Sequence, residues 1–201
     1  SYIPGHAHAD TLSFELSLSG QRVMVNSGTS CYGVGVERFR QRGTSAHNTV
    51  VINGENSSEG WGGFRVARRA KPFDLKINQS NKQIKISCSH DGYKRLRSGP
   101  VHTRKWTFDS NQLVIHDFVD RPFKEIEARY YFHPKVEVKL DASGKKGTAS
   151  IDNKNMISFK VQQGVASILD TTHHPEFGLS INNKCLLIKL DSLESKVCFF
   201  W

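Results

Sequence analysis

Two histidines and a carboxylate stand at alternate positions near the start of the chain, in the run Gly5-His6-Ala7-His8-Ala9-Asp10. If this run is extended, the side chains of residues 6, 8 and 10 project from one face of a strand. Two imidazoles and a carboxylate on one face suit either metal ligation or acid–base chemistry. The alternative is structural, with one histidine as a buried hydrogen-bonding group and Asp10 capping a turn.

A second group of candidates is cationic and aromatic. Its arginines are Arg38, Arg40, Arg42, Arg65, Arg68 and Arg69. Arginine offers paired donors to a carboxylate or sulfate, so these residues predict a groove for an anionic glycan; the alternative is a solvated charged surface. Arg42 and Arg65 flank the proposed site in sequence and are the first candidates for substrate binding. Trp61 lies among glycines and is a candidate for stacking on a sugar ring.

The elements that must position these residues are strands. Leu12, Phe14, Leu16 and Leu18 alternate with polar residues, and Ser19-Gly20 then provides a turn. Asn53-Gly54 after residues 47–52 is a further hairpin signal. Strand-like runs continue over residues 73–78, 83–89, 101–108, 112–119, 126–132, 136–140, 149–151, 156–162, 165–169, 185–190 and 196–201.

This pattern predicts an all-β fold, a large antiparallel β-sandwich of two stacked sheets of the supersandwich kind. No window of a dozen residues has helical periodicity. The longest irregular stretch, residues 28–63, is rich in glycine, serine, arginine and aromatics. A loop of that length in a compact domain is usually functional.

Composition limits the partners. The 201 residues carry a formal net charge of +9, which favours an acidic partner. Nucleic acid is unlikely on sequence grounds, because no recognition motif accompanies the charge. No run of 18 apolar residues is present, so we expect no membrane span. The chain opens at Ser1-Tyr2-Ile3-Pro4 without an initiator methionine or signal peptide, which indicates a fragment.

Four cysteines, Cys31, Cys88, Cys185 and Cys198, are widely spaced and form no CxxC pair, which argues against a zinc knuckle. We expect Cys88 and Cys198, which lie in strand-like runs, to be buried free thiols. The aromatic run at residues 130–132 and the pair His173-His174 are interpreted as structural, the latter as part of a turn.

Several motifs occur in a fixed order: HAHAD at 6–10, SGT at 27–29, RGTxAHNTV at 42–50 and NG at 53–54. Together they resemble the carboxyl-terminal domain of heparinase II/III family polysaccharide lyases. The resemblance is dense over residues 5–72 and thins to a pattern of strands afterwards. Arg104-Lys105-Trp106 and residues 130–134 stand in fitting places. It implies that residues 1–201 are one such β-sandwich domain.

The resemblance also implies an activity. Family members cleave anionic polysaccharides that contain uronic acid, such as heparin, heparan sulfate or alginate, by β-elimination. Most of their proton transfer comes from an α/α toroid domain upstream, which this chain lacks, so the fragment is expected to be inactive alone. His6 matches the substrate-facing histidine of the sandwich. The alternative is a domain that only binds glycan or stabilises the toroid. A bacterial periplasmic or secreted location is implied.

A structural zinc site is implied as well, with His8 and His47 matching two ligands. The third family ligand is an aspartate, and Asn26 takes its place here. A neutral amide leaves the Zn²⁺ charge uncompensated, so affinity should fall. A two-residue turn at Ser19-Gly20 would set Asn26 opposite Ser13 and not beside His8, so the role of Asn26 depends on the resemblance alone.

Overall fold

Strands make up nearly all the regular structure of the computed structural model, which describes residues 5–151 and 155–201. The expectation about Ser1–Pro4 lies outside the described residues. One short helix, α1 (Val36–Arg42), and a 3-10 turn, η1 (Thr44–Ala46), interrupt the strands within the described part of the chain. Both fall in the stretch 28–63, and neither is long enough to produce the periodicity of a helix in the sequence.

The strands follow the predicted alternation closely. They are β1 (Leu16–Leu18), β2 (Gln21–Met24), β3 (Val50–Ile52), β4 (Gly60–Trp61), β5 (Arg65–Val66), β6 (Pro72–Gln79), β7 (Gln83–His90), β8 (His102–Asp109), β9 (Gln112–Val119), β10 (Ile126–Tyr131), β11 (Val136–Leu140), β12 (Lys146–Ile151), β13 (Asn155–Gln163), β14 (Val165–His173), β15 (Ile181–Lys189) and β16 (Glu194–Phe200).

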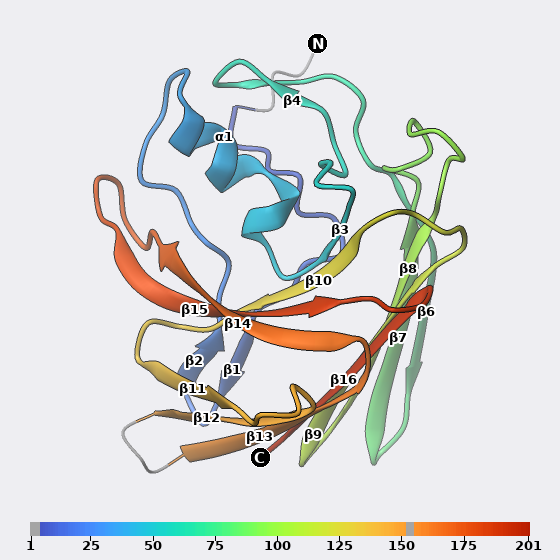
Figure 1. Ribbon diagram of the computed structural model, residues 1–201, viewed down its shortest axis with the longest axis vertical. Helices are drawn as coiled ribbons and strands as arrows, with labels where there is room; N and C mark the ends of the chain where they lie inside the picture. The colour runs from blue at the N-terminus through green and yellow to red at the C-terminus, as the bar shows by residue number, and fades with distance from the viewer. Residues whose placement is uncertain (1–4, 152–154) are drawn as a thin grey trace.

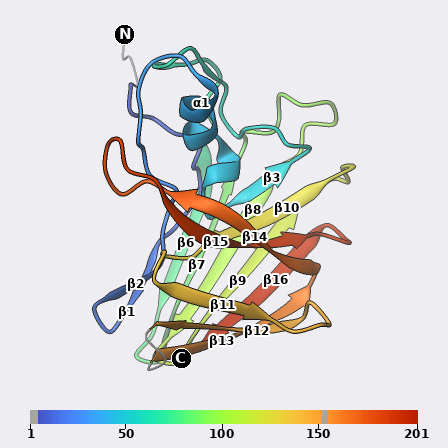
Figure 2. The same cartoon turned by 60° about the vertical axis from the view of Figure 1, so that its left-hand side comes forward.

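Two large antiparallel sheets are stacked, which confirms the predicted all-β sandwich. One has eight strands in the order β11-β12-β13-β16-β9-β8-β7-β6, and the other has four in the order β14-β15-β10-β3. Figures 1 and 2 show the smaller sheet crossing one face of the larger sheet. Two hairpins, β1-β2 and β4-β5, stand apart from these sheets.

The core lies between the two sheets and is made by the apolar half of each alternation. Phe159 and Phe199 of the large sheet approach to 6.0 Å between ring centroids, and Tyr130 of the small sheet lies 5.7 Å from Phe199. All three are 2% exposed or less. Aromatic pairs at these separations stabilise beyond the area that they bury.

The other face of the small sheet is covered by α1, η1 and the loops around them, which lie above β10 and β15 in Figure 1. Tyr131 of β10 points into this layer, and its hydroxyl donates to the carbonyl of Ser45. Its backbone N–H donates to the side chain of Asn48 at 2.6 Å. The third layer is therefore held to the sheet by hydrogen bonds from buried groups.

Two sequence expectations fail locally. Gly5 and His6 form a turn, no strand is assigned between Gly5 and Leu16, and Leu12 has a positive φ of 62°. The side chains of residues 6, 8 and 10 therefore do not share one strand face. Asn53-Gly54 forms a tight turn with a single bridge from Ile52 to Glu55, whereas β3 pairs with β10 instead.

The expected buried thiols are confirmed. Cys88, Cys185 and Cys198 are buried, Cys31 is partly buried, and all four are free. None of the helices in the described part of the chain has the length and apolarity to cross a membrane.

A buried polar network joins the large sheet to the loops. Arg104 of β8 and Asp117 of β9 form a bidentate ion pair at 2.7 and 2.9 Å, with both side chains fully buried. Arg104 also donates to the carbonyl of Leu12 at 2.9 Å and to that of Asn48. Tyr130 donates to Asp117 at 3.2 Å. The pair therefore ties the sheet to both segments that carry histidines.

Two histidines extend this network. The N–H of Gly92 donates to His90 Nδ1, so His90 Nε2 donates to His102 Nδ1 at 3.1 Å and His102 Nε2 donates to Asp117 at 2.7 Å. Burial lowers the pKa of both imidazoles. Burial alone would raise the pKa of Asp117, but the charge of Arg104 and the hydrogen bonds hold it below its usual value.

We predict that Arg104→Met destabilises the protein by about 3–5 kcal/mol, because it leaves Asp117 as an unpaired buried charge. Chemical denaturation monitored by fluorescence measures this change. Lys105→Met is the matched control. The side chain of Lys105 is exposed, so this substitution should shift stability by no more than about 0.5 kcal/mol. A loss below about 1 kcal/mol for Arg104→Met would contradict the assigned role.

We predict that stability falls as the pH is lowered from 7.5 to 5. The unfolded chain takes up protons on His90 and His102 near pH 6.5, whereas the folded state resists them because their pKa values are lowered. This contribution is complete above pH 6.5 and decreases below it. Urea unfolding at several pH values tests it, and His90→Gln should flatten the dependence while the surface change His116→Gln should not.

Candidate functional site

His8 and His47 meet at the inner part of the candidate site. His8 Nδ1 lies 3.2 Å from His47 Nε2, and the hydroxyl of Thr29 lies 3.3 Å from His8 Nε2. His47 is 2% exposed and His8 is partly buried. Burial lowers the pKa of each imidazole to about 4, and for His8 the charges of His47 and Arg38 add to the effect. Both rings are therefore neutral at pH 7.

Arg42 positions the segment that carries the histidines. Its guanidinium donates to the carbonyl of Ala7 at 3.0 Å and to those of Gly62 and Gly63 at 3.2 and 2.8 Å. Its own carbonyl accepts the N–H of Ala9 at 2.8 Å. These bonds join the start of the chain, α1 and the β4-β5 hairpin.

Gly28 brings the next loop against this segment. Its φ is +75°, and an added Cβ would lie 1.9 Å from the carbonyl oxygen of His174. The two residues form a parallel bridge between the loop and the end of β14. Any side chain at this position would collide with the His174 carbonyl, so the bridge requires glycine. The bridge in turn holds Thr29 beside His8.

His6 lies on the surface above this interior. Its side chain is exposed, and Nδ1 is 3.4 Å from the hydroxyl of Tyr32, with the two rings 5.7 Å apart and nearly perpendicular. Arg38 lies beneath, with its guanidinium 5.1 Å from the centre of the Tyr32 ring and donating to the carbonyl of Gly5 at 3.1 Å. Arg38 is only 1% exposed.

Two further exposed aromatic rings lie beside Tyr32, the ring that contacts His6. Tyr32 lies 6.0 Å from Phe64 and 5.5 Å from Phe177, and the three are 47%, 43% and 68% exposed. In the adjoining β4-β5 hairpin, the guanidinium of Arg65 lies 4.7 Å from the centre of the exposed Trp61 ring. We call these five residues with His6 the His6 surface. It combines apolar rings, one exposed guanidinium and an imidazole.

The structure separates Arg42 from the other two substrate-binding candidates. Arg65 and Trp61 pair on the surface, as a glycan contact requires. Arg42 is 5% exposed, and its donors are engaged by backbone carbonyls. In this structure its guanidinium holds loops together, and a contact of Arg42 with substrate stays a prediction.

Asn26 is engaged elsewhere. Its Nδ2 donates to Glu15 at 2.6 Å, and its Oδ1 accepts the N–H of Gly28 at 2.7 Å. Its backbone carbonyl lies 2.9 Å from His173 Nδ1. Both amide atoms thus serve the β1-β2 hairpin and the Gly28 turn.

The donor set does not match a zinc site. Zinc in proteins takes three or four ligands from histidine, cysteine, aspartate and glutamate. Over residues 5–151 and 155–201, no three such side chains come together in a way that could hold a metal ion. His8 and His47 supply two imidazole nitrogens, 3.2 Å apart, and the hydroxyl of Thr29 lies beside His8.

Sequence reasoning missed three features of this region. Tyr32 and Phe177 are single aromatics in irregular loops, and only their position beside glycines marks them as exposed. His174, interpreted as part of a turn, is 3% exposed and accepts from Arg40 at 2.8 Å while donating to the carbonyl of Leu179 at 3.1 Å. Its neighbour His173 is equally buried.

The model of the heparinase II/III-like C-terminal domain matches residues 1–197. The chain belongs to this family. The match covers nearly the whole sequence, including the segments that carry His6, His8, Asn26 and His47. No curated protein sequence matches the chain.

In solved structures, the same fold occurs as part of longer proteins. The heparan sulfate lyase HepC from Pedobacter heparinus is similar with a TM-score of 0.78 and 12% identity, over 97% of this chain and 31% of that chain. The heparinase III-BT4657 gene product is similar with a TM-score of 0.75 and 16% identity, over 97% and 30%. This heparinase II/III-like chain thus spans about a third of these relatives.

We predict that removing divalent metal leaves the protein folded. Because only two imidazoles converge, dialysis against a chelator should leave the melting temperature unchanged, and elemental analysis should find less than one zinc per chain. Added zinc should raise the melting temperature no more in the wild type than in His8→Gln. Equimolar zinc together with a fall in melting temperature on chelation would contradict this prediction.

Proposed function

We propose that this chain is the β-sandwich part of a polysaccharide lyase that cleaves an anionic polysaccharide containing uronic acid by β-elimination. In this proposal the His6 surface forms one wall of the active site, and an upstream α/α toroid domain of the same polypeptide forms the other. The observation that carries it is the exposed His6, held beside the hydroxyl of Tyr32 among rings suited to a sugar.

The chemistry requires a charge partner and proton transfer. A base removes the proton from C5, the released electron pair forms the C4=C5 double bond, and the bond from C4 to O4 breaks as O4 takes up a proton. Neutralising the uronate carboxylate makes the C5 proton more acidic and stabilises the charge that develops. His6 is free to donate a hydrogen bond to that carboxylate or to assist proton transfer, because its ring is exposed.

The surrounding residues would bind the polymer. Arg65 presents donors to a carboxylate or sulfate, and Trp61, Tyr32, Phe64 and Phe177 offer faces on which sugar rings pack. Arg38 and Arg42 act indirectly, since their guanidinium groups fix Gly5 and Ala7 on either side of His6. No step is assigned to a metal.

An open surface of this kind is not a complete active site. His6 is exposed on one side, so nothing in the described residues excludes water from it or fixes a sugar ring against it from above. Orienting a substrate and removing water supply much of the rate enhancement of an enzyme. We therefore expect the chain to be inactive alone.

The proposed substrate class is acidic, and both sulfated heparinoids and alginate belong to it. The net charge of +9 supports an acidic partner, and the activity of the structurally similar HepC, a heparan sulfate lyase, supports the sulfated members. A periplasmic or secreted location would bring the protein to such polymers.

In the full-length protein, we predict that His6→Ala lowers kcat/KM by about 100-fold or more, the usual contribution of a positioned proton-transfer group. The growth of ultraviolet absorbance from the unsaturated uronate product measures turnover. His116→Ala is the control, because His116 lies on the large sheet and pairs with Glu194. The 201-residue chain alone should give no product.

Two outcomes would favour the alternative of a non-catalytic domain that binds glycan or stabilises the toroid. One is unchanged turnover in His6→Ala. The other is a full-length protein that binds acidic polysaccharide but never releases an unsaturated product.

A further inference from the structure

A hollow lined by three lysines lies far from the His6 surface. It has a volume of about 570 Å³ and is formed by β11, β12, β13 and β16. These strands form one edge of the large sheet, and β12 and β13 lie at the opposite end of the molecule from α1 and β4 (Figures 1 and 2). Its polar and aromatic lining includes Lys139, Lys146, Lys160, Thr148, Ser158 and Phe200.

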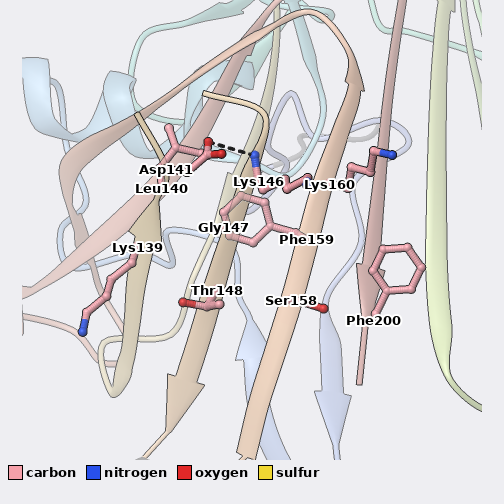
Figure 3. A pocket seen from close by; sticks show the side chains of 10 residues that line it. All are labelled: Lys139, Leu140, Asp141, Lys146, Gly147, Thr148, Ser158, Phe159, Lys160 and Phe200. Carbon is pink, nitrogen blue, oxygen red and sulfur yellow. Dashed lines mark hydrogen bonds between the residues drawn. The ribbon is translucent and has the colours of Figure 1, made fainter. Parts of the chain in front are cut away.

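The strand register creates this arrangement. Lys139 is opposite Thr148, Thr148 is opposite Ser158, and Ser158 is opposite Phe200. Residues that are directly opposite in an antiparallel pair project from the same face. One row across four strands therefore presents an ammonium group, two hydroxyls and an aromatic ring. Figure 3 shows Thr148 and Ser158 on neighbouring strands between Lys139 and Phe200.

A second row places like charges together. Lys146 and Lys160 are directly opposite on β12 and β13, and both side chains are exposed. Like charges at opposed positions destabilise a sheet. Among the described residues, no ion pair neutralises Lys139, Lys146 or Lys160. An arrangement that keeps three ammonium groups without an ion pair at one hollow favours an anionic ligand.

The nearby carboxylate is already engaged. Asp141 accepts the backbone N–H groups of Lys145 and Lys146 at 3.0 and 3.1 Å, and it accepts the hydroxyl of Ser143 at 2.8 Å. It therefore closes the turn between β11 and β12. Its negative charge also interacts with Lys146, so the hollow has three lysine charges against one carboxylate and keeps an excess of positive charge.

We propose that this hollow, which we call the Lys146–Lys160 hollow, is a second binding site for an acidic polysaccharide. Lysines bind the carboxylate or sulfate groups, the hydroxyls of Thr148 and Ser158 exchange hydrogen bonds with sugar hydroxyls, and the ring of Phe200 packs on a pyranose face. Phe200 is 37% exposed, and the volume lies in the range of small-ligand sites.

The basic surface continues beyond the hollow. Lys160 is opposite Cys198 on β16, and Lys196, two residues away, faces the same side. Lys196 is opposite His116 of β9, which is opposite Lys105 of β8. A polymer that occupies the hollow can therefore extend across the sheet over further cations, which a single sugar cannot.

The proposal takes its ligand class from the proposed function but needs no catalysis. The experiment measures binding of a size-defined heparin octasaccharide to the full-length protein by calorimetry at low and moderate salt. Lys139→Ala/Lys146→Ala/Lys160→Ala is compared with Lys71→Ala/Lys94→Ala/Lys124→Ala. The control variant removes the same charge from exposed lysines in other parts of the chain.

The hollow variant should weaken binding about tenfold and the control less than about twofold. Phe200→Ser should also weaken binding, but without changing its salt dependence. If the protein is a lyase, the hollow variant should raise KM for long polymer and leave the turnover of a tetrasaccharide unchanged. If the proposed function is wrong, no variant and no wild-type protein will show turnover, but the hollow variant will still bind the octasaccharide more weakly than the control variant.

Several results would overturn the proposal. Equal weakening by both triple variants would mean that only net charge matters. Equally tight binding of a DNA oligonucleotide of the same charge, lost in the same hollow variant, would assign the hollow to polyanions without preference for sugar. A dimer in sedimentation that dissociates in the hollow variant would assign it to a second copy of the chain. Melting temperatures must match before these comparisons are made.

Discussion

The buried ion pair of Arg104 and Asp117 is the interaction on which the site depends. Removing both charges from water carries a large desolvation cost, which is offset only when nearly every donor and acceptor is engaged. Here Arg104 donates to Asp117, Leu12 and Asn48, and Asp117 also accepts from His102 and Tyr130. Because Leu12 follows the HAHAD motif and Asn48 follows His47, the pair also holds the two histidine segments against the sheet.

The loops that carry the site have little regular structure, so side chains must satisfy their backbone groups. Arg42 serves the carbonyls of Ala7, Gly62 and Gly63, and Thr44 donates to the carbonyl of Ala9 at 2.7 Å. Asn48 donates to the carbonyls of Phe14 and Val25. A buried carbonyl without a partner is costly, so each of these side chains stabilises one loop conformation. His6 can therefore be exposed and still have a defined position.

The strands could be predicted because burial on one face imposes a period of two on the sequence. β9 begins and ends where its alternation does, and the turns at Ser19-Gly20 and Gly164 stand where glycine permits positive φ. The HAHAD segment shows the same alternation, yet it is not a strand. Its partners are the guanidinium and carbonyl of Arg42, some 35 residues away, and alternation carries no information about such contacts. For the same reason the motif order locates Asn26 but cannot show that Glu15 engages its amide.

The net charge of +9 is divided between buried and exposed side chains. Two of the arginines singled out in the sequence, Arg38 and Arg42, are interior residues that bind backbone carbonyls, so they contribute little to the charge that a polyanion meets. The lysines on β12, β13 and β16 belong to no motif, yet the register gathers them on one exposed face. Surface potential depends on exposed charge, so the lysines of the sheet edge contribute more to the attraction of a polyanion than the buried Arg38 and Arg42 do. In the two proposals, a long polymer gains affinity at the sheet edge and reacts at the His6 surface, so binding strength and reactivity lie on separate parts of the sandwich.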